Sequence, residues 1–223
     1  MASDLSGLTI KDEHLRRALE GQEYLLVDGA MGTQMQERGL DALEAVPELL
    51  CKTHADDITA IHASYIAAGA EVITTNTFSA NRLKLGDKMS VEEAYRLAAD
   101  CARAAGAPYI AGDIGPTGSL LEPMGTLSFD EAYGIFAEQV RAAVAAGCDI
   151  ILIETMADLR EAKAALLAAR ENSTLPVFVT MTFGEDGRTF LGTTPEIAAE
   201  VLSSLGAQAV GFNCSLGPAE LVG

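Results

Sequence analysis

The run Asp149-Ile150-Ile151-Leu152-Ile153-Glu154 decides the fold class, because it places four consecutive apolar residues between two carboxylates. An alternating strand buries one face, whereas a short continuous apolar run is typical of a strand buried on both faces of a parallel sheet. Parallel strands need crossover connections, which are usually helices. The run therefore predicts an α/β protein.

The same unit recurs along the chain. Five further apolar stretches have the pattern of strands, at residues 24–28, 71–76, 109–114, 176–182 and 208–212. Helices are expected over residues 57–68 and 90–105 and from residues 128, 158 and 194 onward, after a short amphipathic helix over 11–21. Two of them begin with a Ser-x-x-Glu capping box, at Ser90 and Ser128. A tight turn, and with it a small hairpin, is expected at residues 185–188.

Six strand–helix units at regular intervals predict a (β/α)8 TIM barrel in which about six of the eight units are present. Residues 1–223 are then one domain that is truncated at its C-terminus. A doubly wound open sheet is the alternative. The turn after the first strand, at residues 28–33, lacks the G-x-G-x-x-G fingerprint of such folds, which disfavours that alternative.

Composition narrows the function classes. The formal net charge is −17, which repels phosphate backbones and anionic membrane surfaces, so nucleic acid is not an expected partner. The sequence has no apolar run long enough to span a bilayer and no signal-peptide core, and we expect a cytoplasmic protein. The four cysteines show no paired spacing, so reduced thiols are expected.

Polar residues close the apolar runs, at the end where a barrel carries its active site. They are Asp28, Asn76, Asp113, Glu154, Thr182, Asn213 and Cys214. Taken singly, Asp113 and Thr182 are better explained as structural strand terminators. A polar residue at the end of every run is better explained by a site.

Glu154 is the most informative of these acids. It follows four apolar residues, so burial without compensation would be costly and would raise its pKa. Such a carboxylate needs a cation or hydrogen-bond donors. A substrate ammonium group and a buried salt bridge to another side chain are both open explanations.

Cys214 is the only cysteine at the reactive end of the predicted strands. Cys51, Cys101 and Cys148 are expected to be buried, inert residues. Cys214 is either a nucleophile or a metal ligand. None of the three histidines closely follows a strand, so an activating base is missing and the metal role is favoured. One thiolate cannot hold zinc alone.

Several motifs occur in order along the chain: Asp28-Gly29-Ala30-Met31-Gly32-Thr33, Thr75-Asn76-Thr77-Phe78, Asp113-Ile114-Gly115-Pro116-Thr117-Gly118, Glu154-Thr155, Gly187-Arg188-Thr189 and Gly211-Phe212-Asn213-Cys214-Ser215-Leu216-Gly217-Pro218. Together they resemble the motifs of the homocysteine S-methyltransferase family, and the resemblance covers nearly the whole chain. The chain is most similar to the homocysteine-binding module of members that use cobalamin.

The resemblance implies a zinc-dependent methyl transfer onto homocysteine, with a role for each matching residue. Cys214 matches the first of three zinc thiolates, and the chain ends before the region of the other two. Glu154, with Thr155 beside it, matches the carboxylate that engages the substrate amino group. The remaining substrate-binding candidates are Asp28, Gly29, Ala30 and Met31 in the loop for the amino-acid end, with Asn76 and Asn213 lining the same mouth.

The methyl donor implied by the resemblance is methylcobalamin, presented by another domain or protein, and cobalamin-binding and folate-binding domains are the implied partners. Betaine and S-methylmethionine serve other members and stay open as donors. This chain alone is expected to be inactive and to bind zinc poorly. A truncated, non-catalytic domain that binds amino acids or a partner is the alternative, and an unrelated barrel enzyme with Cys214 as nucleophile is disfavoured.

Overall fold

The computed structural model describes residues 5–40, 46–215 and 217, and its centre is a five-stranded parallel sheet. The strands are β1 (Val72–Thr74), β2 (Tyr109–Ile114), β3 (Ile150–Met156), β4 (Val177–Met181) and β5 (Ala209–Phe212). Each strand lies beside its neighbour in the chain, in the order β1-β2-β3-β4-β5. A doubly wound sheet reverses its strand order at a switch point, and this sheet does not. The α/β fold expected from the sequence is confirmed, as part of a barrel.

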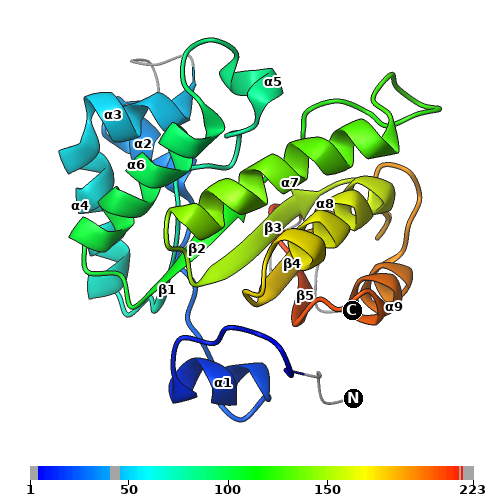
Figure 1. Ribbon diagram of the computed structural model, residues 1–223, viewed down its shortest axis with the longest axis horizontal. Helices are drawn as coiled ribbons and strands as arrows, with labels where there is room; N and C mark the ends of the chain where they lie inside the picture. The colour runs from blue at the N-terminus through cyan, green and yellow to red at the C-terminus, as the bar shows by residue number, and fades with distance from the viewer. Residues whose placement is uncertain (1–4, 41–45, 216, 218–223) are drawn as a thin grey trace.

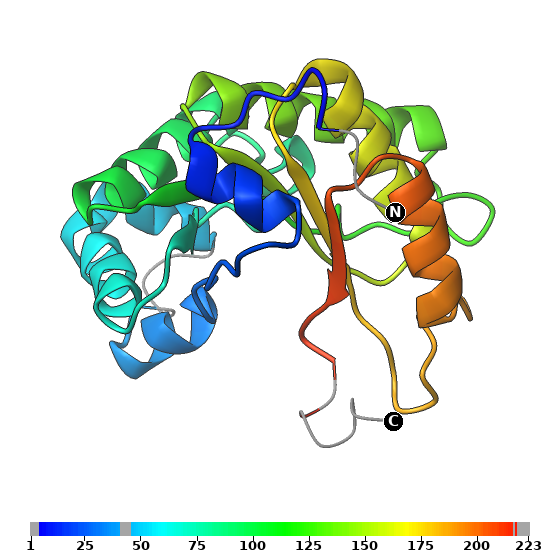
Figure 2. The same cartoon turned by 90° about the horizontal axis from the view of Figure 1, so that it is seen from below.

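Most helices cover the outer face of the curved sheet, whereas the first one, Glu13–Leu19, packs against its inner face (Figures 1 and 2). The helical elements are α1 (Glu13–Leu19), α2 (Met31–Glu37), η1 (Pro47–Leu49), α3 (Leu50–Thr53), α4 (Ala55–Ala67), α5 (Arg82–Leu85), α6 (Val91–Ala104), α7 (Phe129–Ala145), α8 (Leu159–Asn172) and α9 (Pro195–Ser204). In the part of the chain that the structure describes, none of them has the length and apolarity that crossing a bilayer requires.

The helix starts predicted from the capping motifs are confirmed. Ser128 and Glu131 form the complete capping box of α7. Ser90 Oγ accepts from the backbone N–H of Glu93 at the start of α6, and Asp158 caps α8. A side chain that satisfies a free N–H in the first turn fixes where a helix begins, which is why these boundaries are visible in the sequence.

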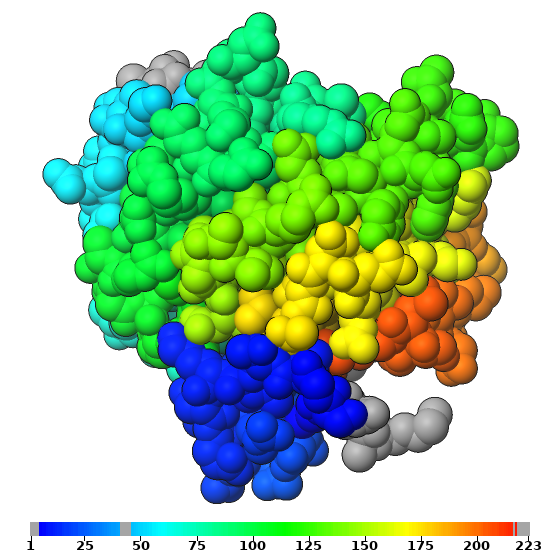
Figure 3. Space-filling view, viewed as in Figure 1, coloured from blue at the N-terminus to red at the C-terminus, as the bar shows by residue number. Residues whose placement is uncertain are grey.

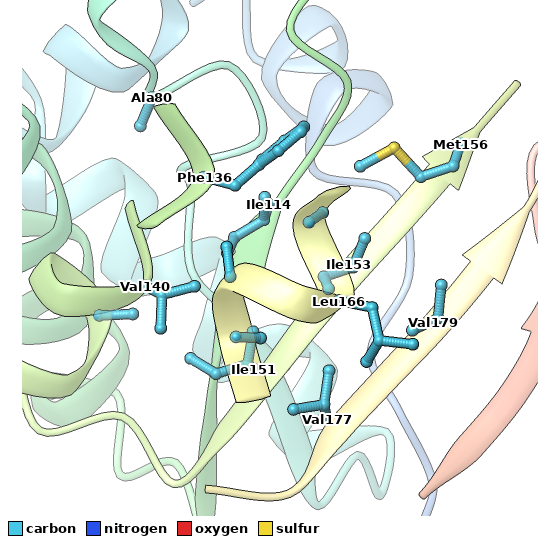
Figure 4. Close-up of a cluster of buried hydrophobic side chains, with 14 of the residues drawn as sticks. Ala80, Ile114, Phe136, Val140, Ile151, Ile153, Met156, Leu166, Val177 and Val179 are labelled. Atoms are coloured by element: carbon cyan, nitrogen blue, oxygen red, sulfur yellow. The ribbon is translucent and has the colours of Figure 1, made fainter. Parts of the chain in front are cut away.

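Alternate residues of the strands pack into two different cores, one on each face of the sheet. Ile151 and Ile153 of β3 face outward and pack with Phe136 of α7 and Leu166 of α8 (Figure 4). Leu152 faces inward, in a smaller cluster with Leu15 of α1. Burial on both faces explains the unbroken apolar run in the sequence.

Close packing of α7 on the sheet depends on a glycine in β2. A Cβ atom at Gly112 would lie 2.7 Å from the Cβ of Ala143 and 3.3 Å from the sulfur of Cys148. Protein interiors leave no room for such an overlap. The absence of a side chain at Gly112 therefore sets the approach of α7 to β2.

The first predicted strand, at residues 24–28, is wrong as a strand. Val27 forms only an isolated parallel bridge with Val72, and Tyr24 and Leu26 are 96% and 55% exposed. The segment pairs with β1 on one side, where Leu26 accepts from the backbone of Glu71 and Val72. Among the described residues no strand lies on its other side, so its apolar pattern does not lead to a buried strand.

The expected turn at residues 185–188 is present, without hairpin strands around it. The N–H of Gly187 donates to the carbonyl of Gly184 at 3.0 Å, and Gly187 has a φ of +68°. A positive φ is easily adopted only by glycine, so the glycine is required by this turn.

Candidate functional site

A cavity of about 750 Å³ opens at the carboxyl ends of the strands. Its wall includes every substrate-binding or metal-binding candidate predicted from the sequence, namely Asp28, Gly29, Ala30, Met31, Asn76, Glu154, Thr155, Asn213 and Cys214. Asp113 also lines it. Thr182 does not. Its hydroxyl donates to the carbonyl of Cys214 at 3.1 Å, and it lines a smaller neighbouring cavity with Phe183 and Arg188.

Asn213 joins three strands at the cavity wall. It directly follows β5, and its Oδ1 accepts from the N–H of Thr155 at 3.1 Å and from the hydroxyl of Thr180 in β4 at 2.9 Å. Its Nδ2 donates to Glu154 Oε2 at 2.9 Å and to Thr155 Oγ1 at 2.9 Å. The amide therefore fixes the end of β3 against β4 and β5.

An irregularity in β3 orients Glu154 and Thr155. The pairing of β3 with β4 shifts register between Ile153 and Met156, and Thr155 has a φ of +60°. A bulge of this kind redirects side chains and is common next to active sites. It places two successive residues, Glu154 and Thr155, in the wall of the same cavity.

Asp28 and Glu154 are carboxyl groups held in a partly water-excluded place. Burial raises the pKa of Asp28 to about 7, with a smaller contribution from the negative charge of Glu154. Asp28 accepts from the N–H and the hydroxyl of Thr74, which opposes the shift. Burial likewise raises the pKa of Glu154, and the hydrogen bond from Asn213 lowers it.

Two further buried carboxyl groups, Asp113 and Glu48, line the same cavity. Burial raises the pKa of Asp113 well above its usual range, and its Oδ1 has no hydrogen-bond partner among residues 5–40, 46–215 and 217. Glu48 Oε1 accepts from the N–H of Ser79 at 2.6 Å, while its Oε2 is equally unpartnered in the described chain.

None of these four carboxyl groups takes part in an ion pair with another described residue. The buried salt bridge considered for Glu154 is therefore not found in this part of the protein. Charge without a counter-ion in a low-dielectric place is costly. The arrangement is suited to a small ligand that brings a positive group.

The cysteines divide as the sequence predicted. Cys51, Cys101 and Cys148 are buried, and Cys214 is exposed. Cys214 Sγ lies 3.7 Å from Asn213 Nδ2. Cys51 Sγ lies 3.6 Å from the Nδ2 of Asn76, which also donates to the carbonyl of Pro47 at 2.9 Å. Asn76 thus braces a loop as well as lining the cavity.

The donor set for a metal is incomplete within the described residues. No group of three or more His, Cys, Asp or Glu side chains in them is arranged to hold a metal ion. Cys214 offers a soft, accessible sulfur at the cavity, which is the ligand type that zinc prefers. Among the described residues, Cys214 is the cysteine whose exposed sulfur is available to a ligand at the cavity.

Sequence reasoning missed Glu48 and Thr180. Thr180 could have been found, because it is a polar residue inside the otherwise apolar strand β4 and burying it requires a hydrogen-bond partner. Glu48 carries no such signal. It belongs to a short 3-10 helix in a segment without clear periodicity.

Comparison with known proteins identifies relatives of this chain. The profile of the homocysteine S-methyltransferase family matches residues 25–223. The methionine synthase of Mycobacterium leprae is 33% identical over 221 residues, covering 90% of this chain and 18% of that protein. The methionine synthase of Mycobacterium tuberculosis is 32% identical over 239 residues, covering 96% and 20%. The chain therefore spans about a fifth of the length of these relatives.

Solved structures agree on the fold. The apo form of the homocysteine methyltransferase MmuM from Escherichia coli superposes with a TM-score of 0.70 at 21% identity, covering 93% of this chain and 78% of that one. Its oxidized form gives a TM-score of 0.68 at 16% identity, covering 94% and 98%. The strand-end cavity, the motifs in its wall and the match over residues 25–223 lead to one conclusion: this chain belongs to the homocysteine S-methyltransferase family.

Proposed function

We propose that the cavity binds homocysteine as the methyl acceptor of an S-methyltransferase reaction that yields methionine. One observation carries the proposal: Glu154, a desolvated carboxylate that pairs with no cation among the described residues, and Cys214, an exposed thiol, lie in the wall of one cavity. Homocysteine has an ammonium group at one end and a thiol at the other. Membership of the family supports this choice of substrate.

Glu154 and Asp28 are the proposed partners of the substrate ammonium group. A positive charge between them would favour the ionised form of both and lower their raised pKa values. The loop of Gly29, Ala30 and Met31 would receive the rest of the amino-acid end. Thr155 and Asn76 would complete the wall.

Cys214 is proposed as one thiolate ligand of a zinc ion whose other ligands are not among the described residues. Bound zinc would deprotonate a coordinated thiol, so that homocysteine sulfur is a nucleophile without a protein base. Two contacts would hold the Cys214 sulfur at the mouth of the cavity. Asn213 Nδ2 contacts the sulfur, and the hydroxyl of Thr182 donates to the carbonyl of Cys214.

The proposed methyl donor is methylcobalamin, carried by another domain or protein. The named relatives are methionine synthases about five times as long as this chain, which leaves room for cobalamin-binding and folate-binding domains in such proteins. We accordingly propose that residues 1–223 act as the homocysteine-binding domain of a larger protein and that this domain alone does not methylate homocysteine. Betaine and S-methylmethionine are the alternative donors.

Calorimetric titration of the protein with L-homocysteine under reducing conditions tests the substrate assignment. Wild-type protein is expected to bind, and Glu154→Gln to bind at least about tenfold more weakly, because a neutral amide cannot balance the ammonium charge. Glu138→Gln, which removes a surface carboxylate paired with Arg82, is the matched control and should bind as wild type.

Equal affinity of wild type and Glu154→Gln would contradict the assignment of Glu154. No binding by wild type would contradict the proposed substrate. If homocysteine binds and the larger protein does not methylate it with methylcobalamin, betaine or S-methylmethionine, a non-catalytic amino-acid-binding domain is the better description.

A further inference from the structure

Two residues with an unusual backbone conformation meet at the cavity. Thr155 and Cys214, with φ values of +60° and +48°, are the non-glycine residues with positive φ in the described ranges. This region is unfavourable for L-residues, and most of all for a β-branched one such as threonine. Such a conformation persists only where surrounding contacts hold it, and it is often found at functional sites.

The contacts that hold Thr155 come largely from one side chain. Asn213 Oδ1 accepts from the backbone N–H of Thr155, and Asn213 Nδ2 donates to the hydroxyl of the same residue. The hydroxyl of Thr180 donates to the same Oδ1 and also accepts from the N–H of Thr155 at 3.3 Å. The strained turn after Glu154 is thus clamped by an amide that belongs to the residue next to Cys214.

The same amide directs the carboxylate of Glu154. Within the described residues, Asn213 Nδ2 is the one hydrogen-bond donor to the carboxylate of Glu154, at 2.9 Å from Oε2. An asparagine amide has two N–H donors and one oxygen with two acceptor sites. Both donors and both acceptor sites are already used by protein atoms, so Asn213 has no hydrogen-bonding capacity left for a substrate.

We propose that Asn213 is a positioning residue, which holds Glu154 and the strained Thr155 in the geometry for substrate binding and couples both to Cys214. This inference rests on the proposed function and revises the sequence-based expectation that Asn213 binds substrate directly. One amide would then fix the distance between the ammonium site at Glu154 and the sulfur site at Cys214. Substrates that present both groups at that separation are selected.

A double-mutant cycle on homocysteine affinity tests the proposal. Asn213→Asp keeps the shape and the acceptor oxygen, but it loses both donors and places a negative charge beside Glu154. We expect Asn213→Asp and Glu154→Gln each to weaken binding about tenfold or more. If the two sites were independent, their losses would multiply, and the double variant would bind homocysteine about 100-fold more weakly than wild type. Because Asn213 acts through Glu154, we expect the double variant to lose far less affinity than that.

Asn172→Asp is the matched control. Asn172 also uses both atoms of its amide, accepting from Arg141 and donating to the carbonyl of Ala168, at a distance from the cavity. It should bind homocysteine as wild type. Circular dichroism melting of each variant separates loss of folding from loss of binding.

Thr180→Val keeps the proposal testable if Asn213→Asp does not fold. It removes one of the two donors to Asn213 Oδ1 and leaves the amide in place. In the wild-type background, we expect Thr180→Val to weaken homocysteine binding about threefold. In the Glu154→Gln background, it should cause no further loss of affinity.

The outcomes distinguish the two proposals. Absence of homocysteine binding in wild type overturns the proposed function. Wild-type affinity in Asn213→Asp, or additive losses in the double variant while Glu154→Gln alone behaves as expected, overturns the positioning role and leaves the substrate assignment standing.

Discussion

The two ends of the sheet differ in whether their carboxylates pair with cations from the described part of the chain. At the amino ends of the strands, Lys11 pairs with Asp149 at 2.9 Å and the hydroxyl of Tyr109 donates to Asp12 at 2.8 Å. At the carboxyl ends, Asp28, Glu48, Asp113 and Glu154 line one cavity, and none of them pairs with a cation among the described residues.

From this difference we infer that the amino-end residues stabilise the fold and that the cavity residues bind a ligand. At the amino end, His14 lies between Glu23 and Glu71, and hydrogen bonds to these carboxylates raise its pKa. The network attaches the N-terminal segment, blue in Figure 3, to one end of the molecule. At the cavity, burial raises the pKa of the carboxyl groups instead, because the hydrogen bonds that they accept do not offset the loss of water.

The largest expected effect concerns Asp28 and the pH dependence of stability. Its folded-state pKa, about 7, lies above the usual 3.8, so the folded protein holds this proton more tightly than the unfolded chain does. The stabilisation is fully present below about pH 4 and is lost as pH rises to 7. Three pKa units correspond to about 4 kcal/mol.

Urea unfolding of wild type and Asp28→Asn from pH 4 to pH 7.5 measures this contribution. The free energy of unfolding of wild type should fall relative to that of Asp28→Asn across this range, by at most about 4 kcal/mol. Parallel pH profiles would show that Asp28 is solvated, and the contrast between the two ends would then not hold for this residue.

His62 tests whether an unpaired polar group is costly where no cavity offers a ligand. Both nitrogens of His62 in α4 are buried and unpartnered among the described residues, and burial lowers its pKa from 6.5 to about 4. The pH dependence of stability that His62 causes is opposite in sign to that of Asp28. Its stabilising contribution is fully present above pH 6.5, and about 3 kcal/mol of it is lost as pH falls to 4.

The variant His62→Leu should abolish this acid-side loss and unfold at higher urea concentration than wild type at pH 5. Its homocysteine affinity should not change, because His62 does not line the cavity. A stability equal to or lower than that of wild type at pH 5 would mean that the histidine has a partner in solution.

Tyr109→Phe tests the amino end, with an intermediate effect. Removing a hydroxyl that donates to a carboxylate is expected to cost about 1.5 kcal/mol of unfolding free energy. Homocysteine affinity should remain that of wild type. A loss of affinity as large as that of Glu154→Gln would contradict the division between a structural and a binding end.

Asp12→Asn should have the smallest effect on the pH dependence of the unfolding free energy, and this effect should be opposite in sign to that of Asp28→Asn. The hydrogen bond from the backbone N–H of Leu15 is the largest cause of a lowered pKa of Asp12; burial opposes it, and the hydroxyl of Tyr109 lowers the pKa further by a smaller amount. Its stabilisation is therefore present above its unfolded pKa and is lost as pH falls below it. In acid unfolding, Asp12→Asn should lose less stability than wild type between pH 5 and pH 3, whereas a greater loss would contradict the pairing.

What the sequence could predict followed from local rules. The capping motifs at Ser90 and Ser128 act within one helical turn, and the apolar run at residues 150–153 reports burial on both faces. The polar strand ends followed from the barrel topology, and the cavity wall contains each of them except Thr182. The helix caps and the apolar run need no knowledge of how distant segments meet, and the strand ends need only the fold class.

What the sequence could not predict depends on long-range register. The bonds of Asn213 to Glu154 and Thr155 join residues 59 and 58 positions apart, and they require β4 to lie between β3 and β5. The entry of Glu48 into the cavity depends on a 3-10 helix without a periodic signal. The segment at residues 24–28 shows the reverse case: it has an apolar pattern, yet Tyr24, Leu26 and Val27 are exposed, because the described residues supply a neighbouring strand on one side alone.

The most direct test of the contrast removes the positive charge from the ligand instead of a charge from the protein. L-Homocysteine and 4-mercaptobutanoate, which lacks only the amino group, are titrated into wild-type protein and Glu154→Gln in the calorimeter. The unpaired carboxylates predict that wild type binds homocysteine at least about tenfold more tightly than the desamino compound and that Glu154→Gln loses most of this preference. Equal affinity of wild type for both compounds would contradict the account, because the carboxyl end of the sheet would then not recognise a cation.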